Sequence, residues 1–348
     1  MDILLVYVFC TFGGVERVIL NRAWAFRKFG LDVHISVGYL QDRGALSSFR
    51  VYLRTHDLER RVFPFILPKN LKIDWQKYTA VFIVDTPQVL AASADAKKVY
   101  VECHTPYKNA RQYLFDLPSH VKKVIVPSHS FGALIQQEFE HLPPIHVLPN
   151  FLTGDFFNPA MPDMPTVFPL RPLVYFARVE DLKNFIEAAR LFESLVERSD
   201  LMYWIIGENA TADHILQSLE RKRLLARSFL RPHVAFEQVP YLVRLIKAHR
   251  GIFFSPSKGE SFGMSAAECM GGGVPVLLSD IPPHRELVEN DSRFLYPLGD
   301  LMTACQRLSW LLDHWDEASE RVYSFSKKFT ASRFIEAWQT LWRDEHAA

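Results

Sequence analysis

The stretch Phe253–Val276 reads FFSPSKGESFGMSAAECMGGGVPV, and its pattern changes several times along its length. It predicts a buried strand over 251–254, a polar turn over 255–259, a helix that begins near Gly263 and a second strand from Val274. The start of a helix carries unpaired N–H groups and a partial positive charge, both of which attract anions. We therefore expect this turn to be able to bind a phosphate group.

Two carboxylates, Glu260 and Glu268, lie eight residues apart across the same turn and helix. Because a helix rises by about 1.5 Å per residue, the two side chains can lie on either side of a phosphate at the helix start. Carboxylates accept hydrogen bonds from hydroxyl groups, and a sugar, a diphosphate and a ribose in this order make a nucleotide sugar. The spacing alone is equally compatible with a Glu260 that caps the helix and a Glu268 on its solvated face.

With its flanks, the stretch resembles the signature of the retaining glycosyltransferases of family 4, which have the GT-B fold. The residues that match in register are Pro256-Ser257, Glu260-Ser261-Phe262-Gly263, Glu268 and Gly273-Val274-Pro275-Val276. The resemblance implies that Glu260 bonds hydroxyls of the donor sugar and that Glu268 holds the ribose. It also implies that the helix start contributes to donor binding through Ser261, Phe262, Gly263 and Met264.

Length and composition describe an ordinary globular protein of two domains. The chain has 348 residues, of which 49% are hydrophobic and 23% charged, and its net charge of +1 gives no reason to expect a nucleic-acid partner. The cysteines are widely scattered and show no metal-ligand spacing: Cys10, Cys103, Cys269 and Cys305. They are typical of reduced residues in a cytoplasmic protein.

No apolar run reaches the ~18 residues that a membrane-spanning helix needs, and the apolar segment 1–10 fits a first strand better than a signal peptide. Association with the inner face of a membrane stays open. The segments Arg50–Arg61 and Glu220–Arg231 mix cations with large apolar residues. We expect each to form a solvated amphipathic helix, with an interfacial helix that meets a lipid-linked acceptor as the alternative. The sequence does not predict the oligomeric state.

Short apolar runs alternate with helix-patterned segments along the whole chain, as in parallel sheets covered by helices on both faces. In the first half we expect strands at 3–8, 33–37, 80–84, 98–103, 121–126 and 145–148, and helices at 15–29, 107–114 and 130–140. Ser128 stands where its hydroxyl can cap the last of these helices.

The segment Pro149–Pro172 is rich in proline without a period, and predicts a linker between two domains. Beyond it we expect strands at 173–177, 202–206 and 234–236, and helices from 183, at 213–226, 241–248, 301–314, 316–328 and 332–345. The sequence thus predicts a domain over 1–150, a linker over 151–172 and a second domain over 173–328. The resemblance implies two Rossmann-like lobes that face each other across a cleft, with the last segment, 329–348, crossing back to the first lobe.

The first predicted strand is followed by Gly13 and Gly14, and then by Glu16. Glycine lets a backbone approach a ligand closely and adopt positive φ, so this loop is able to give N–H groups to a phosphate or a sugar. The loop is not the GxGxxG of a dinucleotide fold, and on its own it indicates a plain tight turn. The resemblance implies that Gly13 and Gly14 contact the donor phosphate and sugar, and we expect Glu16 to be structural.

Arg178 and Lys183 follow the first strand of the second domain. Two cations at the end of a strand can neutralise a departing diphosphate through charge-assisted hydrogen bonds. The alternative is a surface arginine paired with Glu180 or Asp181. The resemblance favours the diphosphate role for both cations, although Ala177 stands where the family usually has glycine.

His104 ends the strand predicted at 98–103, where a solitary histidine is more often structural. The resemblance implies that it contacts the donor sugar near the reacting carbon, as a hydrogen-bonding or proton-transferring group. Just beyond it, Tyr107, Lys108 and Arg111 are candidate acceptor contacts by position alone.

Two further segments align less fully with the family. The turn Gly207-Glu208-Asn209 lacks the second glycine of the usual Gly-x-Gly. The segment Phe236–Pro240 corresponds to the one whose backbone reads the nucleobase, so Gln238 and Val239 are candidate donor contacts.

The sequence therefore predicts a retaining glycosyltransferase that moves a sugar from a nucleoside diphosphate, by default uridine diphosphate, to a hydroxyl of a glycan or a lipid-linked sugar. We expect no obligatory divalent metal, because no Asp-x-Asp lies in a likely ligand loop, and no other cofactor. The alternatives are a nucleotide-sugar epimerase of the same architecture and a catalytically silent nucleotide-sugar-binding protein. A nicotinamide dehydrogenase is disfavoured by the missing fingerprint.

Overall fold

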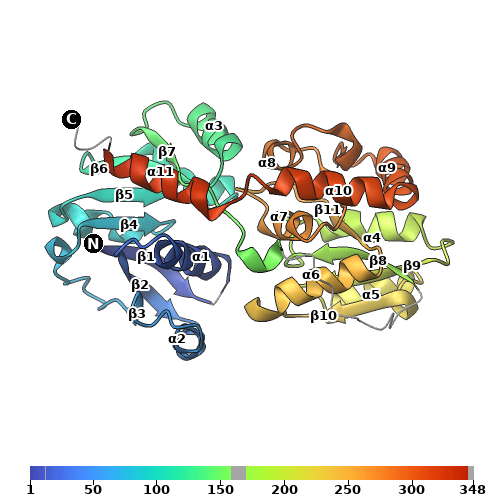
Figure 1. Ribbon diagram of the computed structural model, residues 1–348, viewed down its shortest axis with the longest axis horizontal. Helices are drawn as coiled ribbons and strands as arrows, with labels where there is room; N and C mark the ends of the chain where they lie inside the picture. The colour runs from blue at the N-terminus through green and yellow to red at the C-terminus, as the bar shows by residue number, and fades with distance from the viewer. Residues whose placement is uncertain (12, 158–169, 344–348) are drawn as a thin grey trace. The chain divides into compact units, whose positions relative to one another are not determined.

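The apolar runs of the chain form two separate parallel sheets, each covered by helices, in a computed structural model that describes residues 1–11, 13–157 and 170–343 (Figure 1). Unit 1 consists of Met1–Phe151 and the described residues from Thr330 onward, and unit 2 consists of the described residues of Leu152–Phe329. The predicted α/β architecture with two Rossmann-like lobes is confirmed. Most of the predicted proline-rich linker, 158–169, lies outside the described residues, as does the predicted end of the last helix beyond 343.

The described residues of unit 1 form a seven-stranded parallel sheet in the order β3-β2-β1-β4-β5-β6-β7. The strands are β1 (Asp2–Cys10), β2 (His34–Asp42), β3 (Val62–Ile66), β4 (Ala80–Val84), β5 (Val99–Glu102), β6 (Val121–Val126) and β7 (Ile145–Val147). The helices are α1 (Gly14–Lys28), α2 (Leu46–Thr55), α3 (His129–Glu138) and α11 (Ala331–Arg343). Central strands such as β4 are buried along their whole length, which explains their unbroken apolar pattern.

The sequence prediction misses part of unit 1. It places an amphipathic helix at Arg50–Arg61, whereas α2 ends at Thr55 and β3 follows as an edge strand beside β2. The helix predicted at 107–114 is a 3₁₀ helix, Lys108–Phe115. The hydroxyl of Ser128 accepts a hydrogen bond from the N–H of Phe131, as expected for the cap of α3.

The last helix, α11, packs on unit 1, as the resemblance implied. It contacts α1, and its aromatic rings pack on α1 and on β4 of the sheet. The ring of Trp338 lies 4.8 Å from that of Phe26 and 5.7 Å from that of Phe82, and the ring of Phe334 lies 5.6 Å from that of Phe26. These buried rings attach the end of the chain to the first domain.

The described residues of unit 2 form a six-stranded parallel sheet in the order β10-β9-β8-β11-β12-β13. The strands are β8 (Arg171–Phe176), β9 (Leu201–Ile206), β10 (Ser228–Arg231), β11 (Ile252–Ser255), β12 (Val276–Ser279) and β13 (Leu295–Tyr296). The helices are α4 (Phe185–Ser194), α5 (Asp213–Arg221), α6 (Val239–Ala248), α7 (Met264–Gly271), α8 (Pro282–Leu287), α9 (Leu301–Asp313) and α10 (Trp315–Ser326).

Two predictions for unit 2 are wrong. The segment Glu220–Arg231 is not one helix, because α5 ends at Arg221 and Arg223 adopts the left-handed conformation, with φ of 58°. Its last residues form β10, which pairs with β9. The predicted strand 234–236 is instead a turn that leads into a 3₁₀ helix, Phe236–Gln238. Pairing with β9 outweighs the local helical pattern, because β10 gains a ladder of backbone hydrogen bonds.

Candidate functional site

The loop between β11 and α7 holds Glu260, and α7 itself carries Glu268, the second predicted glutamate. Gly263 directly precedes α7 and has a φ of 94°, a conformation that residues with a Cβ rarely adopt. Gly263, at the N-cap position of α7, makes no side-chain cap itself. The N–H groups of its first turn lack helical partners, so this end of the helix is suited to an anion.

Glu260 lies in this loop and is held by two hydrogen-bond donors. The ammonium of Lys183 donates to Oε1 of Glu260 at 2.6 Å, and the hydroxyl of Ser257 donates to the same oxygen at 2.8 Å. The side chains of Lys183 and Glu260 are 16% and 14% exposed. Burial works to raise the pKa of Glu260, but the charge of Lys183, with His284 and the two hydrogen bonds, outweighs burial and lowers this pKa. The structure therefore joins two predicted donor contacts in one ion pair.

The backbone beside Lys183 explains why asparagine follows it. Asn184 is left-handed, with a φ of 54°, and directly precedes α4. Its side-chain amide donates to Oε2 of Glu187 at 2.7 Å, while Oε1 of Glu187 accepts from the N–H of Gly299 at 2.9 Å. Glu187 thus ties the Lys183 turn to the loop before α9.

Arg178 lies on the surface with its side chain 53% exposed, and it pairs with Glu180 at 3.1 Å. This is the contact that the alternative interpretation of the sequence expected. Nearby, Lys258 donates to Asp181 at 2.6 Å. Arg178 is accessible to a ligand, but an anion would compete with Glu180 for its guanidinium.

The departures from the family pattern at 177 and 209 are accommodated. Gly207 has a φ of 145°, and a Cβ there would lie 2.0 Å from the carbonyl oxygen of Ala177, so only glycine fits. Asn209 adopts the left-handed conformation with a φ of 67°, which asparagine tolerates better than most residues. The turn keeps a left-handed residue at the position of the missing glycine.

The remaining predicted donor contacts of unit 2 lie on or just before α7 and at the start of α6. Glu268 is buried on α7. Phe262 is also buried and packs edge-on against Phe329, with ring centroids 5.3 Å apart. Gln238 is exposed at the end of the 3₁₀ helix and accepts a hydrogen bond from Arg231, whereas the side chain of Val239 is buried.

The sequence analysis missed His284, which lies on α8 and is fully buried. Its Nδ1 lies 2.9 Å from the carbonyl oxygen of Ser279, while its Nε2 has no hydrogen-bond partner among the described residues. A Cβ on Gly263 would lie 3.9 Å from this Nε2. Burial lowers the pKa of His284, although the charge of Glu260 works against this. The one signal in the sequence was a histidine shortly after the Val-Pro-Val strand, which is too common to single out.

In unit 1 the two glycines of the predicted donor loop lie in different surroundings. The N–H of Gly13 donates to Oε2 of Glu16 at 2.6 Å, so this amide is already satisfied within the protein. Neither Gly13 nor Gly14 has a positive φ. Gly14 begins α1, and a Cβ there would meet no atom within 4 Å. The open space at Gly14 leaves room for a ligand, and Glu16 has the structural role that we expected.

His104 lies directly beyond β5 in a cluster of charged side chains. Its Nε2 is 2.7 Å from Oε1 of Glu102, and its backbone N–H donates to Oδ2 of Asp85 at 3.0 Å. Glu102 also forms an ion pair with Arg22 on α1. Burial raises the pKa of Asp85 to about 6. Burial also works to raise the pKa of Glu102, but the charge of Arg22 and the hydrogen bonds from His104 and Arg22 outweigh it and lower this pKa to about 2. The structure thus brings His104 together with residues that the sequence analysis did not single out.

The three candidate acceptor contacts lie in different environments. Tyr107 and Lys108 are exposed. Arg111 is buried, donates to both carboxylate oxygens of Glu138 at 2.7 Å and donates to the carbonyl of Pro106 at 2.8 Å. Its guanidinium fixes the loop and has little capacity left for a ligand.

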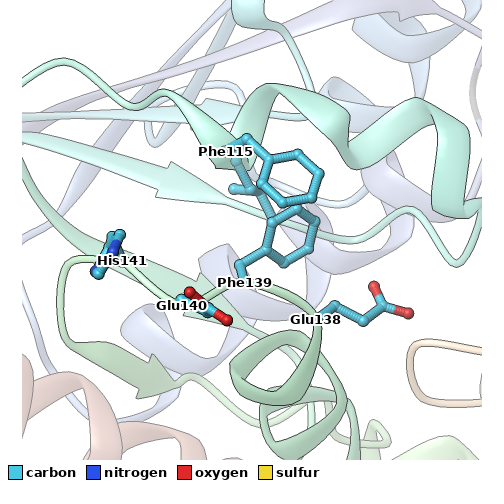
Figure 2. A pocket seen from close by; sticks show the side chains of 6 residues that line it. Phe115, Glu138, Phe139, Glu140 and His141 are labelled. Atoms are coloured by element: carbon cyan, nitrogen blue, oxygen red, sulfur yellow. The ribbon is translucent and has the colours of Figure 1, made fainter.

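A small pocket of unit 1 lies beside this loop but does not contain the predicted site. In Figure 2 the rings of Phe115 and Phe139 lie next to each other, and the carboxylate of Glu138 points away from them. The two rings meet edge-on, with their centroids 4.6 Å apart. The residues that line it are Leu114, Phe115, Glu138, Phe139, Glu140 and His141. None of them is a predicted donor contact.

Among the described residues, no group of three or more His, Cys, Asp and Glu side chains is arranged to hold a metal ion. None of the described helices combines the length and the apolar character needed to cross a membrane.

Comparison with known proteins concerns unit 2 first. Residues 171–329 match the model of the family described as "Glycosyl transferases group 1". This unit is similar to the group 1 glycosyltransferases. The match takes in the strands and loops that carry Arg178, Lys183, Glu260 and Glu268.

Two curated relatives are described as GDP-mannose:cellobiosyl-diphosphopolyprenol alpha-mannosyltransferases. The one from Xanthomonas oryzae pv. oryzae is 28% identical over 127 residues, which cover 36% of this chain and 33% of the relative. The one from Xanthomonas campestris is 29% identical over 117 residues, which cover 33% of this chain and 30% of the relative. The chain thus spans about a third of the length of the curated relatives it matches.

Solved structures match the whole fold. TarM has a TM-score of 0.78 with 13% identity, and the match covers 98% of each chain. HepE from Anabaena, in a complex with UDP and glucose, has a TM-score of 0.74 with 17% identity, and the match covers 100% of each chain. At these identities the likeness shows the GT-B fold alone.

Proposed function

We propose that the protein is a retaining glycosyltransferase that moves a sugar from a nucleoside diphosphate to a hydroxyl group of an acceptor. The observation that carries the proposal is the Lys183–Glu260 ion pair, 2.6 Å long, in front of the start of α7. A cation, a carboxylate and free N–H groups are the three kinds of group that a sugar diphosphate needs. The match of residues 171–329 to a glycosyltransferase family supports the same function.

Donor binding, in this proposal, exchanges the partners of the ion pair. The diphosphate takes the ammonium of Lys183 and the N–H groups around Gly263 and Met264, and sugar hydroxyls take the carboxylate of Glu260. Glu268 binds the ribose, Gln238 and the backbone of Val239 contact the nucleobase, and Arg178 adds charge once it leaves Glu180. Neither Lys183 nor Glu260 is left as an unpaired buried charge, because the diphosphate and the sugar hydroxyls replace the partner that each one loses.

Bond cleavage develops positive charge on the sugar and negative charge on the diphosphate. Groups already aimed at the diphosphate stabilise that charge without reorganisation, and one such donor contributes on the order of 10²–10³-fold to the rate. Lys183 and the start of α7 are the groups in this position. As the bond between the anomeric carbon and the diphosphate oxygen breaks, the acceptor hydroxyl attacks that carbon from the same face and gives its proton to the departing phosphate, so the new glycosidic bond retains the configuration. Gly14, through its open side, and His104 are assigned to the transferred sugar, and Tyr107 and Lys108 to the acceptor.

The direct test is acceptor-dependent release of nucleotide by the purified protein. UDP-glucose and GDP-mannose, each with a panel of glycan and lipid-linked acceptors, should give release that rises when the right acceptor is added. The UDP arm follows our default, and the GDP arm follows the names of the two mannosyltransferases. NMR of the product should show the anomeric configuration of the donor. An inverted product would end the retaining mechanism.

The same assay separates the alternatives. An epimerase would convert the donor without acceptor, and a silent binding protein would show thermal stabilisation by the donor but no release with any acceptor. Activity that survives EDTA would support the metal-independent mechanism that we propose. Co-sedimentation with anionic vesicles would distinguish a peripheral membrane contact from a purely cytoplasmic location.

A further inference from the structure

Glu102 is the last residue of β5, and its carboxylate is buried between two cationic or hydrogen-bonding side chains. Arg22 donates to Oε2 from Nη1 at 3.0 Å and pairs with Oε1 through Nη2. The imidazole of His104 approaches Oε1 at 2.7 Å through Nε2. Both carboxylate oxygens of Glu102 therefore already accept hydrogen bonds, which hold the carboxylate in one orientation.

The ionisation of Glu102 decides which nitrogen of His104 carries a proton. A carboxylate beside an arginine stays ionised and can only accept hydrogen bonds. The ring nitrogen that faces it must then be an N–H, so Nε2 is the protonated nitrogen of the neutral ring. Nδ1 is left with a lone pair and can accept a hydrogen bond.

The other side of the ring is available to a ligand. Nδ1 of His104 makes no hydrogen bond with the described residues. The side chain of His104 is 11% exposed, whereas that of Glu102 is only 1% exposed. The main chain is also held, because the N–H of His104 donates to Asp85 at 3.0 Å. Because both the ring and the backbone of His104 are held in place, the lone pair of Nδ1 points in one fixed direction.

Arg22 determines what the carboxylate contributes. Because the guanidinium shares the negative charge of Glu102, the carboxylate orients the ring more than it increases the ring's basicity. Arg22 is itself buried, and its guanidinium carbon lies 5.7 Å from the ring centroid of Phe334 on α11. A chain of contacts thus runs from the last helix through Arg22 and Glu102 to His104.

We propose that Glu102, held by Arg22, is a positioning residue that fixes His104 with Nδ1 as a hydrogen-bond acceptor for a hydroxyl group of a sugar substrate. This inference rests on the proposed function and adds the tautomer of His104 and the residue that sets it.

The tautomer is tested directly by NMR of protein with ¹⁵N-labelled histidine, with the His104 signals assigned by loss in His104→Asn. In the free wild-type protein at neutral pH we expect Nε2 to carry the proton and Nδ1 to be bare. In Glu102→Gln, whose amide can donate as well as accept, we expect this preference to be lost. A proton on Nδ1 in the wild type would overturn the proposal.

Kinetics of two histidine variants test the same point without disturbing the Arg22–Glu102 pair. The amide of asparagine reaches the place of Nδ1, whereas that of glutamine reaches the place of Nε2. We expect His104→Asn to retain about 10-fold more acceptor-dependent transfer than His104→Gln. Equal activities or the reverse order would overturn the proposal.

Binding of free UDP or GDP serves as the control, because the residues assigned to the nucleotide belong to unit 2. Both variants should bind the nucleotide as the wild type does. If the wild type shows no transfer with any donor and acceptor, the proposed function fails, while the NMR result still decides the tautomer. If the wild type transfers but the variants do not differ, only the present inference fails.

Discussion

The two units differ in how accessible the ion pairs at the ends of their strands are. In unit 2, Lys183–Glu260, Lys258–Asp181 and Arg178–Glu180 are ion pairs that water or a ligand can reach. In unit 1, Arg22–Glu102 is buried, and Asp85 is held by a backbone N–H and the hydroxyl of Tyr113. Exposed pairs are inexpensive to exchange for a ligand, whereas buried pairs are costly to break. We infer that the ion pairs of unit 2 are suited to exchange their partners for a ligand, whereas the buried pair of unit 1 fixes the positions of its neighbours.

Replacing Lys183 tests the exchangeable site with the largest expected effect. Lys183→Ala should lower kcat about 10²–10³-fold or more, because the diphosphate loses a preorganised cation. Only one partly exposed ion pair is lost, so the melting temperature should fall by no more than about 4 °C.

Lys258→Ala is the matched control, because Lys258 forms an equally short but exposed pair with Asp181. It should keep activity within about twofold. Equal effects of the two substitutions on activity would mean that Lys183 has no special role in donor binding.

Glu268 tests the nucleotide side of the same unit. Glu268→Gln should weaken binding of free UDP or GDP about 10- to 100-fold in isothermal titration, since hydrogen bonds to a charged group contribute about 1.5–3 kcal/mol. Unchanged affinity for the free nucleotide would remove the ribose role from Glu268.

Gly14 tests whether the open space in unit 1 is used by the donor. Gly14→Ala should fold normally, because a Cβ there meets no atom and φ is not positive. It should raise the KM for the donor about 10-fold by occupying the space of the ligand. Gly154→Ala is the control, because Gly154 is equally open. An unchanged KM would mean that the donor does not occupy the space beside Gly14.

The smallest effect concerns the pH dependence of stability in unit 1. The pKa of Asp85 is raised by burial to about 6, so the folded state favours the protonated carboxyl. Its contribution to stability is full below pH 3.8 and is lost as pH rises through about 6. The melting temperature of Asp85→Asn, relative to the wild type, should therefore rise between pH 4.5 and 7.5. A constant difference across this range would mean that Asp85 does not titrate there.

Local patterns predicted the regular elements well where one signal dominated. The apolar run 80–84 is β4, and Ser128 caps α3 as its position suggested. The start of α7 at Met264 was also predicted, because the pattern places a helix that begins near Gly263. Prediction failed at Glu220–Arg231, where a helical pattern competes with pairing to β9. Sequence spacing cannot show which distant strand offers hydrogen bonds.

For the candidate site, the sequence by itself determined which groups have the right chemistry. Chemistry and position left Glu260, Lys183 and His104 compatible with structural roles, and the resemblance of the surrounding motifs selected them as candidate donor contacts. Only the tertiary structure decided their partners: Lys183 with Glu260, Arg178 with Glu180, and His104 with Glu102. A residue type sets which bonds a group can form, but the folded backbone sets which bonds it does form, whether the partner is 77 residues away, as for Lys183 and Glu260, or two, as for His104 and Glu102.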